Sequence, residues 1–70
     1  MTNTNLLKQL IEESGLKMGF IASTVGISRQ SLWNKVNNQS MFNQFEIDKL
    51  CEVLKVTSLK QKEAIFFAKM

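Results

Sequence analysis

Residues 20–38 read FIASTVGISRQSLWNKVNN, and this stretch decides the fold. Its spacing predicts two short helices joined by a tight turn that begins at Gly26 and ends at Ser28. A glycine ends a helix most simply with a positive φ, which would cost a residue with a side chain about 1 kcal/mol or more. Ser28 is suited to cap the second helix, because its hydroxyl can accept a hydrogen bond from the amide of Gln30 or Ser31.

Apolar side chains recur at helical spacing on one side of each helix, and we expect these sides to face the core. The first helix is expected over about Met18 to Val25, and the second over about Arg29 to Asn37. Residues four apart lie on the same side, because each residue adds about 100° of rotation. The residues expected to build this motif, about positions 18–37, are Ile21, Ala22, Val25, Gly26, Ile27, Leu32 and Val36.

The other sides of the second helix carry polar and basic side chains and the only tryptophan. Trp33 lies off the apolar side and suits an external contact, although a core position is the alternative, since tryptophan is largely buried on average. Arg29 is either a contact residue or a solvated charge, and Lys35 is expected to be a plain surface lysine. Met18 either faces a partner or fills a gap in the core.

The helical spacing continues on both sides of this motif, which predicts an all-α domain of five helices over residues 1–70. The first helix is expected over residues 4–14, with Thr4 as its N-cap and Gly15 as its C-cap.

Two capping boxes mark the starts of the last two helices. The pairs are Asn43 with Glu46 and Ser58 with Gln61, and the first of these two helices should end near Lys55.

The fifth helix, expected to end near Ala68, is more apolar than one buried side requires, because residues 64–68 are all apolar. Two interpretations stay open. In the first, the phenyl groups of Phe66 and Phe67 both belong to the core. In the second, one of them closes the core and the rest of the segment joins two copies of the chain. The residues of this candidate oligomer contact are Ile65, Phe66 and Phe67.

Composition restricts the function classes open to the chain. With no histidine and one cysteine, an intrachain disulfide and a Cys/His zinc site are excluded, and Cys51 is expected in the core. The few carboxylates lie on helix faces where a solvated role is the default, so we expect no enzyme, no metal and no cofactor. The chain has neither an apolar run near the roughly 20 residues of a membrane span nor a secretory signal, which predicts an intracellular protein.

The net charge of +3 is small, but its distribution is one-sided. No Asp or Glu lies between Glu13 and Glu46, whereas Lys17, Arg29 and Lys35 do. Such a segment favours contact with phosphate groups or with an acidic protein surface. Three charges alone would support only weak, salt-sensitive DNA binding, so a dimer or further contacts would be needed.

The central motif resembles the helix-turn-helix of phage Cro and repressor proteins. Ala22 is followed four residues later by Gly26 and then by ISRQSL at positions 27–32. The sequences FEI at 45–47 and IFFA at 65–68 are similar to a subgroup of small Cro-like proteins from temperate phages of Gram-positive bacteria, lactococcal phages among them. The resemblance spans the whole chain as a compact five-helix domain, and it implies a cytoplasmic transcription regulator in a bacterial host.

The resemblance also implies roles for particular residues. In this family the second helix of the motif enters the major groove of operator DNA with its N-terminal end first. Arg29 would then pair with guanine and Gln30 with adenine, and Asn37 and Asn38 would lie near the DNA backbone. The residues expected to face DNA or a protein partner are Met18, Ser28, Arg29, Gln30, Trp33, Asn34, Asn37 and Asn38.

The chain departs from the family where the first helix of the motif begins. That helix usually starts with a polar residue that touches phosphate, whereas here Met18, Gly19 and Phe20 stand there, and Met18 cannot donate a hydrogen bond. Trp33 replaces a small or polar reader. Tryptophan and arginine surrounded by polar residues also describe a protein-binding hot spot.

Two functions therefore stay open. The apolar departures favour a modulator or antirepressor of the lysis–lysogeny switch. It would bind the phage's main repressor through its helix-turn-helix face and block or alter operator binding, acting against the repressor or as its co-repressor. The alternative is an autonomous Cro-like homodimer that binds operator DNA by itself. Neither function involves a membrane.

Overall fold

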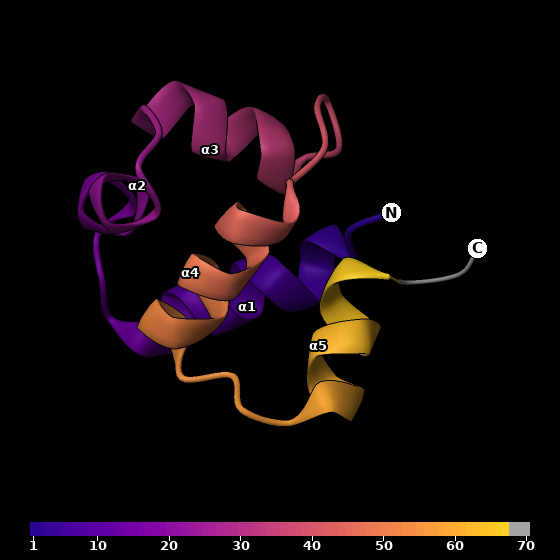
Figure 1. The fold of residues 1–70 in the computed structure, drawn as a ribbon. Helices are drawn as coiled ribbons and strands as arrows, with labels where there is room; N and C mark the ends of the chain where they lie inside the picture. Colours follow the sequence, from indigo (N-terminus) through magenta and orange to yellow (C-terminus); the bar gives the residue numbers. More distant parts are fainter. Residues whose placement is uncertain (68–70) are drawn as a thin grey trace.

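Five α-helices build the part of the chain that the computed structural model describes, residues 1–67, and no strand occurs there (Figure 1). The predicted all-α fold is confirmed over these residues. The predicted end of the fifth helix at Ala68 lies outside them. The helices are α1 (Thr4–Ser14), α2 (Met18–Val25), α3 (Arg29–Val36), α4 (Gln44–Leu54) and α5 (Leu59–Phe66).

The two longest helices, α1 and α4, lie at the centre, with α2 and α3 on one side and α5 on the other (Figure 1). Accordingly, α2 packs against α3 and α4, whereas α1 contacts α3, α4 and α5. The core between them is aliphatic apart from Phe66 and Cys51, and the ring of Phe66 meets that of Phe42 edge to face at 5.6 Å. The predicted motif residues Ile21, Ala22, Val25, Leu32 and Val36 lie in this core, and Ile27 packs against it.

Most helix boundaries follow from the predicted caps. Gly15 and Gly26 end α1 and α2 with φ angles of 71° and 94°. The N-cap of α1, however, is Asn3 and not Thr4, because the Asn3 side chain accepts a first-turn amide hydrogen bond at 3.1 Å. The hydroxyl of Thr4 instead donates to the carbonyl of Val36 at 2.7 Å and so joins α1 to the end of α3.

The capping box of α4 is complete. The amide of Glu46 donates to the side chain of Asn43 at 2.8 Å, and the amide of Asn43 donates back to the Glu46 carboxylate at 2.9 Å. At α5, the hydroxyl of Ser58 accepts a hydrogen bond from the amide of Gln61 at 3.4 Å. The helix that was expected to reach Asn37 ends one residue earlier, and Asn37 is its cap.

The end of α5 corrects one interpretation of the apolar segment. Ile65 and Phe66 are buried in the core, so neither can join two copies of the chain without unpacking it. Phe67 is 51% exposed and borders an apolar hollow with Met1 and Met41. One phenyl group therefore closes the core, and the other faces outward.

Residues 2–4, which we call the N-terminal clip, connect the end of α3 to α5. Asn38 adopts a φ of 62°, accepts the amide of Thr2 at 3.0 Å and donates to the Thr2 carbonyl at 2.8 Å. The amide of Asn3 donates to the carbonyl of Ile65 at 2.6 Å. Together with the threonine hydroxyl bond described above, these contacts hold the last turn of α3 in place.

Candidate functional site

The turn between α2 and α3 brings Met18, at the start of α2, close to the outer side of α3, where Arg29 and Trp33 lie. The amides of Gly26 and Ile27 both donate to the carbonyl of Ala22, at 2.8 Å and 3.0 Å. The hydroxyl of Ser28 accepts the amide of Ser31 at 3.0 Å, which starts α3 as predicted. Figure 1 shows α2 end-on while α3 runs across the view, so the two helices cross steeply.

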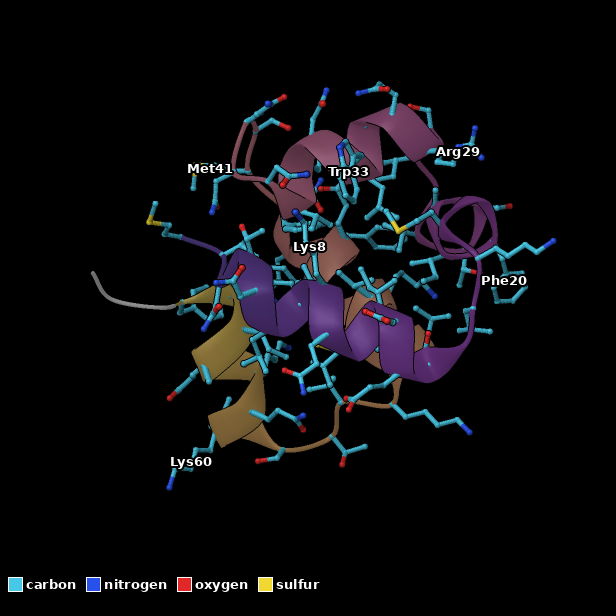
Figure 2. The ribbon with its side chains drawn as sticks, turned by 180° about the vertical axis from the view of Figure 1, so that it is seen from behind. Lys8, Phe20, Arg29, Trp33, Met41 and Lys60 are labelled. Atoms are coloured by element: carbon cyan, nitrogen blue, oxygen red, sulfur yellow. The ribbon has the colours of Figure 1, made fainter. Side chains whose placement is uncertain are left out.

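Trp33 lies on the outer side of α3, and the alternative core position is wrong. Its side chain is 45% exposed, whereas Leu32 and Val36 on the same helix are fully buried. The ammonium of Lys8, from α1, lies 4.8 Å from the centroid of the indole ring (Figure 2). A cation at this distance is attracted by the electrons of the ring face. Sequence reasoning missed Lys8, because its place beside Trp33 depends on how α1 packs against α3.

Four of the predicted partner-facing residues surround one hollow, which we call the α2–α3 hollow. It is lined by Met18, Arg29, Gln30 and Trp33. Met18 is half-buried and also packs against the core, so both interpretations of this residue hold in part. Phe20, which follows Met18 by two residues in the first turn of α2, is 56% exposed. Apolar groups therefore form much of the surface around the start of α2 and the outer side of α3.

The side-chain amides of Gln30 and Asn34, both on α3, are hydrogen-bonded to each other. Gln30 donates from its side-chain nitrogen to the side-chain oxygen of Asn34 at 3.0 Å. Bidentate reading of adenine uses both the oxygen and the nitrogen of one amide, so Gln30 would first have to give up this bond. The geometry of the free protein therefore does not present Gln30 ready for an adenine.

The remaining predicted contact residues hold the chain together. Ser28 caps α3, and Asn37 donates from its side chain to the carbonyl of Trp33 at 2.9 Å. The side chain of Asn38 binds the N-terminal clip. These three side chains form hydrogen bonds within the fold, so the candidate contact surface has fewer residues than predicted and centres on the α2–α3 hollow.

Lys35 is not the plain surface lysine that we expected. Its ammonium lies 2.6 Å and 2.7 Å from the two carboxylate oxygens of Glu46, and only 15% of its side chain is exposed. Burial by itself would raise the pKa of Glu46, but hydrogen bonds from Lys35 and from the Asn43 amide hold it below its usual value. Lys35 thus connects α3 to α4 through an ion pair, and Glu46, which does not line the hollow, neutralises its charge.

The cations near the hollow have no such partner. Among residues 1–67 the other ion pairs are Lys49 with Glu52 and Lys62 with Asp48, all on α4 and α5. Arg29, Lys8 and Lys17 therefore lack an ion-pair partner in the described chain. The positive charges of Arg29, which lines the hollow, and of Lys8, beside Trp33, are therefore not neutralised by an ion pair.

Two kinds of structural feature are absent from residues 1–67. No helix in that part of the chain is long and apolar enough to cross a membrane. Over the same residues, no three side chains of His, Cys, Asp or Glu gather where they would bind a metal ion.

No family model, no curated protein and no solved structure matches this chain. Similarity therefore adds no family assignment, and the case for a function rests on the surface around Trp33.

Proposed function

We propose that this chain is a small phage transcription regulator of the lysis–lysogeny switch, acting without catalysis in the cytoplasm of a bacterial host. It modulates repression by binding the phage's main repressor through the face built by α2 and α3, which serves as its helix-turn-helix. This contact blocks or alters the binding of the repressor to its operator. The observation that carries the proposal is the half-exposed Trp33 between Met18 and Arg29.

Desolvation favours a protein partner over a DNA groove. Contacts with a phosphate backbone are polar and salt-dependent, so they gain little from a thioether, a phenyl ring and an indole. A protein partner would bury all three, and the removal of apolar surface from water favours association. Tryptophan and arginine are also the residues that most often dominate the free energy of protein–protein binding.

The alternative, an autonomous Cro-like dimer on operator DNA, is favoured by a different observation. No side chain caps the N-terminus of α2, and Lys17 stands at its N-cap position. Helix N-termini with free amides attract phosphate groups. A single chain offers few such contacts, so this alternative requires a second copy. Of the three residues predicted for an oligomer contact, the exposed Phe67, which caps α5, remains available for it.

A gel-shift assay with operator DNA, the main repressor and this protein distinguishes the two functions. For a modulator, this protein alone leaves the DNA unshifted at moderate salt. When it is added to the repressor, the repressor–operator band either disappears or is replaced by a band of lower mobility. Sequence-specific binding by this protein alone, combined with no effect on the repressor, would establish the Cro-like alternative.

A further inference from the structure

The surface around Trp33 combines an apolar hollow with unpaired positive charge. The α2–α3 hollow has a volume of about 180 Å³ and is open to solvent. Its walls are formed by Met18, Trp33, Arg29 and Gln30. Such walls suit an aliphatic or methionine side chain of a partner, because thioethers and aromatic faces both make favourable apolar contacts.

Two cations flank the same indole. Arg29 lines the hollow, and the ammonium of Lys8 lies 4.8 Å from the centroid of the ring (Figure 2). Contact with an aromatic ring orients an ammonium group without neutralising its charge. Within residues 1–67 neither cation forms an ion pair, and neither Glu12 nor Glu13 of the neighbouring α1 lies within pairing distance of them.

We infer that the partner inserts an apolar side chain into the α2–α3 hollow and sets the carboxylate of an adjacent Asp or Glu against Arg29, with Lys8 adding to the attraction. This inference rests on the proposed function and specifies the chemistry of the repressor patch that is bound, which is acidic around an apolar centre. The planar guanidinium group matches a carboxylate with two parallel hydrogen bonds. A DNA phosphate would also satisfy Arg29, but it would leave Met18 and Trp33 without an apolar contact.

The test compares Arg29→Glu with Lys60→Glu in calorimetric titrations with the purified repressor. Each substitution lowers the net charge by two, from +3 to +1, and Lys60 lies on α5, far from Trp33 in Figure 2. Glutamate at the first position of a helix is favourable to the helix dipole, so Arg29→Glu should fold normally. We expect Arg29→Glu to weaken the complex about tenfold or more and Lys60→Glu to leave its affinity nearly unchanged.

Magnetic resonance locates the contact independently. Trp33 is the only tryptophan, so a nitrogen-15-labelled sample has a single indole N–H resonance, which should shift when unlabelled repressor is added. Among Asp→Lys and Glu→Lys variants of the repressor, one should restore binding to Arg29→Glu and so identify the paired carboxylate.

The two proposals fail differently. If the repressor binds and shifts the indole resonance, but Arg29→Glu and Lys60→Glu weaken the complex equally, the acidic patch is wrong and the modulator function stands. If the repressor does not bind the unmodified protein at all, the modulator function fails. If the unmodified protein alone binds operator DNA and Arg29→Glu abolishes that binding, the anion on Arg29 is a phosphate, and the inferred carboxylate is overturned.

Discussion

The ammonium of Lys35 binds both carboxylate oxygens of Glu46, and this pair joins the last turn of α3 to the first turn of α4. Because Glu46 also completes the capping box of α4, one side chain both starts a helix and fixes its neighbour. The pair is largely shielded, with 15% and 7% of the two side chains exposed. The pair therefore stabilises the fold, whereas the surface around Trp33 is the candidate contact site.

Removing the charge of Glu46 should destabilise the fold. We expect Glu46→Gln to lower the free energy of unfolding by about 1–2 kcal/mol, because it leaves the shielded ammonium of Lys35 without its anion. Denaturation in urea measures this loss. Asp48→Asn is the matched control, since it breaks the exposed pair with Lys62 and should change stability much less. Equal losses in the two variants would contradict a special role for the shielded pair.

The same pair makes stability depend on pH. The pKa of Glu46 is lowered below its usual 4.5, since the bonds from Lys35 and Asn43 outweigh the effect of burial. Its ionised form is therefore favoured in the folded state, and the stabilisation is present above that usual value and lost as the pH falls through the folded pKa. We expect the melting temperatures of the unmodified protein and Glu46→Gln to converge in acid. A constant difference down to low pH would show that the charge of Glu46 is not responsible.

Asn38 combines a left-handed backbone with a side-chain role, and two substitutions separate them. Asn38→Gly should cost about 1 kcal/mol, because it removes the hydrogen bonds to the N-terminal clip but tolerates the φ of 62°. Asn38→Ala removes the same bonds and adds backbone strain of about 1 kcal/mol more. Thermal unfolding of both variants measures the difference. If alanine proved as stable as glycine, strain at this position would be negligible.

Adjacent phenylalanines at the end of α5 should respond differently to truncation. Phe66→Ala should cost about 3 kcal/mol, since it leaves a cavity against the ring of Phe42 in the core. Phe67→Ala should leave the unfolding free energy nearly unchanged, because its side chain is half exposed. Sedimentation of the Phe67→Ala variant then tests the outward phenyl as a contact between copies. A chain that is dimeric with Phe67 and monomeric without it would favour the Cro-like alternative.

Trp33→Ala should affect binding and not folding. We expect a loss of about 2 kcal/mol or more in the free energy of repressor binding, as for a hot-spot tryptophan, with little change in thermal stability. Met41→Ala is the matched control, because Met41 is highly exposed and lies on the connection after α3, away from Arg29 and Phe20 in Figure 2. Equal affinities of both variants for the repressor would place the contact elsewhere.

Local chemistry made much of the fold predictable. Glycine at 15 and 26, serine at 28 and 58, and the box of Asn43 with Glu46 act within one turn of chain, so their structural roles follow from spacing alone. The outer position of Trp33 likewise follows from the placement of Leu32 on the same helix. The N-cap of α1 was misplaced by one residue, because Thr4 is drawn into a contact with α3 that spacing does not reveal.

Contacts between distant segments were not predictable in the same way. Lys35 with Glu46, Lys8 with Trp33 and Asn38 with Thr2 each depend on how separate helices pack. Their effect on the candidate site is substantial. The pair of Lys35 with Glu46 removes a cation from the candidate site. The contact of Lys8 with Trp33 adds a cation, and the bonds of Asn38 to Thr2 remove an asparagine. The sequence pattern listed more candidate contact residues than the packing leaves free.

α3 is anchored entirely from its inner side, by Leu32, Val36, the Lys35–Glu46 pair and the N-terminal clip. The residues that line the α2–α3 hollow from this helix, Arg29, Gln30 and Trp33, support none of those anchors. Substitutions at these three outward positions should therefore change what the surface binds while leaving the scaffold beneath it intact.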